Sequence, residues 1–272
     1  MTSSLSYSPG PLLHRVNDNA AVVLLGGQRA LLLQLAHPLV AAGVHNHSRS
    51  LSDPFGRLIR TLDFMDALVF GTEEEKEKAV RGFRSVHATV RGRLKEPARP
   101  FAPNTLYTAL SPPLLLWVWA TLVDTAPLVY QRVVSPLSSR QRAAFYRDSK
   151  EWGMRLGIPA KLIPATWQEF RTYMGTTLSH LSISPTAQRL APDILFPPGM
   201  PVIFSFALAL VTVELLPPPV RKGYGLQHPE VQKACARFFL SAVRLIWPLV
   251  PERLQSAETI RSLLLRLAPQ QG

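Results

Sequence analysis

The stretch from Leu33 to Val44 reads LQLAHPLVAAGV and decides the fold class of this 272-residue chain. Its leucine, alanine and valine residues predict a buried helix. Pro38 predicts a kink in that helix, because proline removes a backbone donor and crowds the preceding turn. On both sides of this stretch, the chain contains further apolar segments, which end at proline or glycine. No alternating pattern of useful length indicates a strand. We therefore predict an all-α protein of about ten helices.

The predicted helices form a single domain over residues 1–272, with a core of about 20–226 and C-terminal helices at about 229–267. A hydrophobic content of 47% is sufficient for a sizeable core. The capping-box pattern Thr72-Glu-Glu-Glu75 predicts the start of a helix that reaches about Leu94. The run from Met200 to Leu216 carries Glu214 and is shorter than the ~20 residues that span a bilayer, so a buried core helix is predicted, with a membrane-associated segment as the alternative.

The chain is strongly basic, with 30 Lys and Arg against 18 Asp and Glu and a net charge of +12. Such an excess fits a nucleic-acid partner, an anionic membrane surface or an arginine-rich genome. The charges are scattered, which favours a solvated surface and argues against nucleic acid, with a peripheral membrane contact as the alternative. Cys235 is the single cysteine, so no disulfide framework is expected. The N-terminus lacks a signal pattern, and we expect a cytoplasmic protein.

Motifs of several common enzyme classes are absent from the sequence. No HExxH or ExxH pair supports a zinc protease or a ferritin-type di-iron site. No GxSxG, Walker A or GxGxxG motif supports a hydrolase, an NTPase or a dinucleotide-binding enzyme. Any chemistry must therefore come from a less common arrangement of side chains.

The predicted helix at 72–94 carries His87 among apolar residues at spacings of three and four, so His87 is expected to face the core or a cavity in it. Two interpretations stay open. His87 is either a core histidine satisfied by a backbone carbonyl, or a neutral imidazole that holds a haem iron in an apolar cavity.

The preceding segment, Asp53 to Thr61, reads DPFGRLIRT and has the cap and proline of a helix start. Arg57 and Arg60 are three residues apart and share a helix face. Their guanidinium groups could bind haem propionates. In the plainer interpretation, they lie on a solvated face and make ordinary ion pairs. Thr61 could donate a hydrogen bond to bound oxygen or substrate. His37, at the Pro38 kink, is a cavity residue or a packing residue.

His45-Asn-His47 follows Gly43, at the end of the stretch that contains Pro38. Two histidines separated by one residue are a weak metal signal, and capping or loop structure is favoured.

In order along the chain, the segments QLAHPLVAAGVHNHS (34–48), DPFGRLIRT (53–61), VHATVRG (86–92), LLWVWATL (115–122) and LLPPPVRKGYGL (215–226) resemble the family of latex-clearing protein (rubber oxygenase) and MpaB. The resemblance extends from about residue 29 to 226. It implies an α-helical oxygenase with haem b and dioxygen, with His87 as the iron ligand. It also implies that Arg57, Arg60 and Thr61 line the distal side or contact the cofactor, and we expect His37 near it.

Two positions depart from the family pattern. Rubber oxygenase has a lysine, which can occupy the distal iron position, where this chain has Arg60. Arginine stays protonated and is a poor ligand, so an open or water-filled distal position is expected. Many relatives have histidine where this chain has Trp119, and no general base is assigned.

The favoured function is a haem b-dependent oxygenase that acts with dioxygen on an apolar small molecule or polymer, isoprenoid or lipid-like. The alternative is a non-catalytic haem- or lipid-binding protein of the same fold. A nucleic-acid-binding helical protein is the weaker third hypothesis.

Overall fold

The computed structural model describes residues 11–47 and 54–267. This part of the chain is mostly helical, which confirms the all-α prediction. The α-helices are α1 (Pro11–Asn17), α2 (Ala20–Leu35), α3 (Pro38–His47), α4 (Pro54–Phe70), α5 (Glu73–Ala88), α6 (Pro112–Val133), α7 (Ser139–Arg155), α8 (Trp167–His180), α9 (Pro185–Leu195), α10 (Val202–Leu215), α11 (Pro218–Gly223), α12 (Glu230–Ile246) and α13 (Ala257–Leu267). Within the described residues, short 3₁₀ helices lie at Ala160–Leu162, Trp247–Leu249 and Glu252–Leu254.

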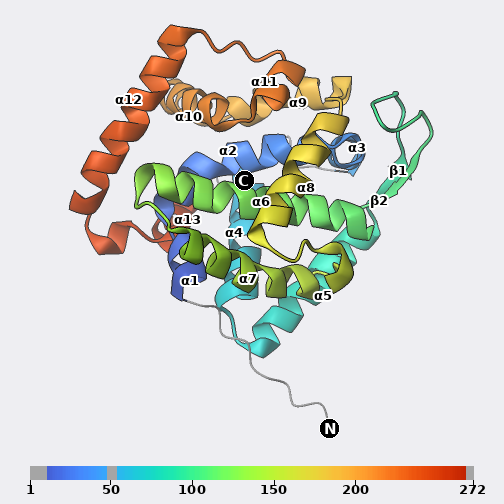
Figure 1. The fold of residues 1–272 in the computed structure, drawn as a ribbon, viewed down its shortest axis with the longest axis horizontal. Helices are drawn as coiled ribbons and strands as arrows, with labels where there is room; N and C mark the ends of the chain where they lie inside the picture. Colours follow the sequence, from blue (N-terminus) through green and yellow to red (C-terminus); the bar gives the residue numbers. More distant parts are fainter. Residues whose placement is uncertain (1–10, 48–53, 268–272) are drawn as a thin grey trace.

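The helix α6 lies at the centre of the molecule (Figure 1) and packs mainly against α2. By length and composition α6 could cross a membrane, but most of its side chains are buried by other helices. Its buried residues include Trp117 and Trp119, which belong to the main core. The central apolar helix is therefore the core of the fold, surrounded by the remaining helices.

The change of direction predicted near His37 is confirmed, but the single helix predicted across Pro38 is wrong. The helix ends at Leu35, and α3 restarts at Pro38 after a bend of 104°. Pro38 has no backbone donor and takes the first position of the new helix, where none is needed. The bend places α3 beside α9 and the β-strands, and it leaves His37 at the corner.

The prediction that the chain has no strand is wrong for one segment. A hairpin of β1 (Arg91–Arg93) and β2 (Leu106–Thr108) pairs antiparallel and projects beside α3 (Figure 1). Three paired residues are too few to give an alternating sequence pattern. Gly92 is needed there, because a Cβ would lie 2.7 Å from the hydroxyl of Tyr107.

The same hairpin corrects the end of α5, which was predicted to reach Leu94 but ends at Ala88. Its predicted start is confirmed: the Thr72 hydroxyl accepts from the Glu75 backbone N–H, and the Glu75 carboxylate accepts from the Thr72 backbone N–H at 2.7 Å. Beyond Ala88, Leu94 donates its backbone N–H to Thr105 across the hairpin. The local cap was readable in the sequence, whereas the distant partner was not.

The prediction for residues 200–216 is correct for only part of the segment. The later residues of α10, from Ala209 to Leu215, are largely buried. The first turns are exposed, and Ile203 exposes 77% of its surface. The two C-terminal helices also pack on the core, with α12 against α6 and α10, and α13 against α2 and α4.

Candidate functional site

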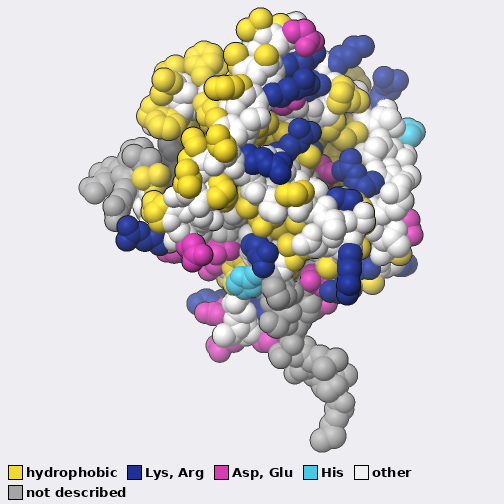
Figure 2. All heavy atoms as spheres, turned by 60° about the vertical axis from the view of Figure 1, so that its left-hand side comes forward, with side chains coloured by type: hydrophobic (Ala, Val, Ile, Leu, Met, Phe, Trp, Pro, Cys, Tyr) yellow, Lys and Arg dark blue, Asp and Glu magenta, His cyan; other side chains and the backbone are white. Residues whose placement is uncertain are grey.

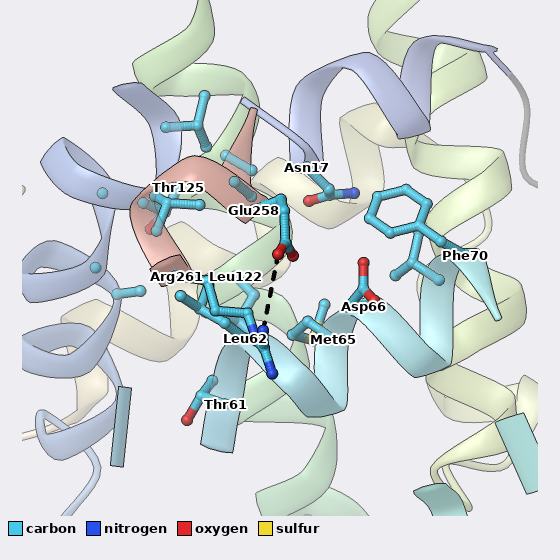
Figure 3. A pocket seen from close by; sticks show the side chains of 18 residues that line it. Asn17, Thr61, Leu62, Met65, Asp66, Phe70, Leu122, Thr125, Glu258 and Arg261 are labelled. Carbon is cyan, nitrogen blue, oxygen red and sulfur yellow. Dashed lines mark ion pairs between the residues drawn. The ribbon is translucent and has the colours of Figure 1, made fainter. Parts of the chain in front are cut away.

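A cavity of about 150 Å³ lies between α2, α4, α6 and α13 (Figure 3). Its walls are mostly apolar and come from segments far apart in the sequence: Val22, Val23, Ala30, Leu62, Met65, Val69, Phe70, Leu122 and Ala126. This volume matches the size of an apolar cavity that admits a benzene-sized group. The cavity can therefore hold a segment of an apolar ligand, and it is smaller than the ~300 Å³ at which pockets for whole ligands begin.

Two glycines of α2 shape this cavity. A Cβ at Gly26 would lie 3.0 Å from the Thr125 methyl group, so the glycine allows α2 and α6 to approach closely. A Cβ at Gly27 would meet nothing within 4 Å, and Gly27 lines the cavity. One glycine brings the helices together, and the next leaves space between them.

Polar side chains form one edge of the cavity, where Asn17, Asp66, Glu258 and Arg261 lie (Figure 3). Arg261 lies 3.8 Å from the Glu258 carboxylate and also pairs with Asp63. Partial burial, followed by the nearby carboxylates of Glu258 and Asp18, raises the pKa of Asp66. A carboxyl group that keeps its proton to a higher pH than usual therefore faces an apolar space.

Next to the cavity wall, a buried ion pair connects α2 to α6. Arg29 lies 2.7 Å from the Asp124 carboxylate and donates to the Thr125 hydroxyl, which belongs to a residue of the cavity wall. Arg29 also donates to the Leu215 carbonyl at 2.9 Å, and Arg171 pairs with Asp124 from α8. Sequence reasoning missed this network, because Arg29 is 95 or more residues from each of its partners and Arg171 is 47 residues from Asp124.

The predicted iron ligand, His87, lies on α5 at the contact with α4. Its ring stacks on Phe83 with centroids 3.9 Å apart, and Phe83 stacks on Phe64 of α4 at 5.2 Å. His87 is half-buried and lines neither this cavity nor the groove described below. The expectation that it faces the core is therefore wrong in part: α5 packs only its edge on the core, and His87 lies at the rim.

The two helices are joined by the short connection at Gly71-Thr72 and pack on each other. Arg60 lies one turn before Phe64, and His87 lies one turn after Phe83, so both lie on the side of the Phe64–Phe83 contact away from that connection. Arg60 also shares the face of α4 that meets α5, because it is four residues from Phe64. The fold thus brings Arg60, Thr61 and His87 to the same end of one helix pair.

The hydrogen bond of His87 suits a metal ligand. Its Nδ1 lies 2.8 Å from the Phe83 carbonyl oxygen, which can only accept, so this nitrogen carries the proton and donates. The lone pair is then on Nε2, as in histidines that bind metals while Nδ1 is held by a carbonyl. The same bond satisfies an ordinary helix histidine: His180 lies 2.7 Å from the Thr176 carbonyl in the same way. Both interpretations of His87 share this geometry.

The other predicted site residues are placed as follows. Thr61 lines the cavity, and Arg60 is exposed and does not line it. Arg57 lies on α4, and its side chain falls outside the described residues, as does Asp53, the predicted cap. His47 approaches the Arg91 carbonyl at 2.9 Å. Within residues 11–47 and 54–267, no group of three or more His, Cys, Asp or Glu side chains could hold a metal ion.

His37 lies in a separate, open groove, where Phe101, Tyr107 and Arg91 are among its neighbours. Its Nδ1 accepts the backbone N–H of Leu39 at 3.3 Å, so the ring proton is on Nε2. His37 therefore presents a donor and fits a hydrogen-bonding role better than iron ligation. Burial lowers its pKa to about 4.

This shift predicts a pH effect on stability. The pKa of His37 is about 4 in the folded protein, against 6.5 for a solvent-exposed histidine in the unfolded chain, so the unfolded chain binds more protons between these limits. We expect the free energy of unfolding to fall by about 2–3 kcal/mol as the pH drops from 6.5 to 4. Chemical unfolding across this range should show a flatter profile for His37→Gln. An equal slope in both proteins would contradict the assignment.

Trp119, one of the two positions expected to depart from the family pattern, is a core residue. It is fully buried among the rings of Tyr146, Trp152 and Phe170 and donates its Nε1–H to the Ser149 carbonyl at 3.1 Å. A Cβ at Gly153 would lie 2.8 Å from this Nε1, so the indole fits because α7 has glycine there. Trp119 lines neither the cavity nor the groove.

Several cavity residues were not predicted from the sequence, above all Glu258 and Arg261. They come from α13, almost 200 residues after α4, and their helix reads as an ordinary amphipathic segment. The sequence did hold a signal for Asp66, because this acidic residue lies five residues after Thr61 on the helix that was predicted to contact the cofactor.

Two curated relatives match most of the chain. They are Uncharacterized protein Rv2237 of Mycobacterium tuberculosis (strain ATCC 25618 / H37Rv) and Uncharacterized protein Mb2261 of Mycobacterium bovis (strain ATCC BAA-935 / AF2122/97). Each is 27% identical over 232 residues, which cover 82% of this chain and 88% of the relative. No solved structure matches the chain.

A family model described as "ER-bound oxygenase mpaB/B'/Rubber oxygenase, catalytic domain" matches residues 14–246. This range includes α2 to α5, where Thr61 and His87 lie, and it ends at the last residue of α12. The chain therefore belongs to the MpaB and rubber oxygenase catalytic-domain family.

Proposed function

We propose that this protein is a haem b-dependent oxygenase acting on an apolar, isoprenoid or lipid-like substrate. The observation that carries the proposal is the placement of His87 and Thr61 at the same end of the α4–α5 pair, with Thr61 in the wall of an apolar cavity. Membership of an oxygenase family supports the reaction class.

The donor set fits a haem. His87 would hold the iron through Nε2 while the Phe83 carbonyl accepts from Nδ1–H, and Arg60 on the facing side of α4 would bind a propionate through its guanidinium. The Phe83 ring lies on the imidazole at 3.9 Å, so it has to move when a porphyrin binds at His87. The cavity is too small for the macrocycle, and its apolar lining supports a role in binding a segment of the substrate.

When bound, haem would supply the activation of dioxygen. The apolar walls of the cavity would bind a segment of the substrate by burial and exclude water from it. Thr61 would donate its hydroxyl proton in a hydrogen bond to a polar atom at the cavity wall. Asp66, with its raised pKa, is the carboxylate of this wall that could take up a proton.

The test uses the purified full-length protein with haemin. We expect a saturable Soret band at one haem per chain, and oxygen uptake when an isoprenoid or unsaturated lipid is added. A protein that binds no haemin would overturn the proposal. Haem binding without oxygen uptake, across a panel of such substrates, would favour the non-catalytic carrier instead.

A further inference from the structure

One side of the molecule, formed by the start of α10 and the outer face of α12, exposes large apolar side chains. On α12, Val231, Cys235, Phe238, Ala242 and Leu245 recur at spacings of three and four and so form one stripe. Phe238 and Leu245 expose 77% and 79% of their surfaces. The opposite stripe of α12, which includes Ala236 and Leu240, packs against the core. The helix is therefore apolar on two faces, and one of them has no cover in the described chain.

The exposed start of α10 adjoins the end of this stripe. Met200, just before α10, and Trp247, just after α12, pack on the same small cluster, which contains Ile59 and Ile260. The first turns of α10 then expose four more large side chains: Val202, Ile203, Phe204 and Phe206. Figure 2 brings this side forward and shows hydrophobic side chains gathered there with Lys and Arg between them. We call these residues of α10 and α12, together with Leu249, the apolar face.

The charge around the apolar face is positive. Residues 196–254 contain six Lys or Arg and three Glu, with no Asp. On α12 the cations lie together: Lys233, Arg237 and Arg244 fall on one side of the helix between the exposed and buried stripes. Glu214 pairs with Arg237, and Glu230 pairs with Lys233, while the Arg244 side chain extends from an exposed position.

We propose that the apolar face docks on the surface of an anionic membrane. An interfacial helix has this composition, with Phe and Leu on one side and Lys and Arg beside them. Anionic headgroups complement the cations, whereas a second copy of the chain would bring its own +12 charge and the same arginines to the contact. The cluster of Met200 and Trp247 also contains Leu62 and Val23, which line the cavity, so docking would bring the cavity close to lipid.

The inference does not depend on haem, and its test uses no activity. The full-length protein is floated with vesicles of phosphatidylcholine alone, and with vesicles containing phosphatidylglycerol, at low and high salt. We expect binding to the anionic vesicles that weakens as salt rises. Phe238→Gln/Leu245→Gln should lower the partition coefficient at least about tenfold, because both side chains would be buried in the interface. Arg244→Gln should lower it about fivefold.

Leu106→Gln is the matched control, because Leu106 is 66% exposed on β2, outside the apolar face. It should bind vesicles like the unchanged protein. Equal binding of the double variant, or no preference for anionic lipid, would overturn the proposal. A dimer in size-exclusion chromatography that dissociates in Phe238→Gln/Leu245→Gln would instead assign the apolar face to a second copy.

Discussion

His87→Ala is expected to abolish the Soret band of the haemin-loaded protein and to reduce stoichiometric haem binding to weak, non-saturable association. The alanine removes the nitrogen proposed to hold the iron, and the described cavity is too small to retain a porphyrin by burial alone. The measurement is a haemin titration followed by absorption. Because His87 is half-buried at the rim of the core, the far-ultraviolet circular dichroism should stay unchanged.

His180→Ala is the matched control for this experiment. His180 makes the same hydrogen bond, from a ring nitrogen to the carbonyl four residues earlier, at an exposed position at the end of α8. It should bind haemin like the unchanged protein. Added imidazole should restore a Soret band to the His87→Ala variant, because free imidazole can bind in the space that the histidine ring leaves. Full haem binding by His87→Ala without imidazole would show that His87 is not the iron ligand.

Asp124→Asn is expected to destabilise the fold by about 3–5 kcal/mol, the usual cost of leaving a buried charge uncompensated. Arg29 is 2% exposed and lies 2.7 Å from Asp124. The substitution keeps the size of the side chain but removes the charge that neutralises the guanidinium. Urea unfolding, followed by tryptophan fluorescence, measures the loss.

Arg171→Gln separates this effect from a general loss of ion pairs. Arg171 pairs with the same carboxylate but its side chain is 51% exposed, so its loss should cost no more than about 1 kcal/mol. If Asp124→Asn is too unstable to purify, Arg29→Met/Asp124→Leu should recover folded protein, because it removes both charges. A loss below about 1 kcal/mol for Asp124→Asn would show that the buried pair contributes little.

Prediction from the sequence was most accurate where the signal is local. The cap at Thr72 and the break at Pro38 were both found where expected, since each depends on neighbouring residues. It was wrong where a distant segment decides the outcome. The end of α5 depends on pairing with β2, and the exposed start of α10 depends on what the rest of the chain leaves uncovered.

The same distinction between local and distant signals applies to the candidate site. Arg60, Thr61 and His87 could be named in advance from their order along the chain, and the sequence by itself determined the all-α fold and the family that contains it. Only the tertiary structure decided that Thr61 faces a cavity with Asp66, Glu258 and Arg261, and that His87 lies at the rim beside Phe83. The physical reason is that helix formation follows local periodicity and caps, whereas a cavity exists only where side chains from distant helices fail to fill the space between them.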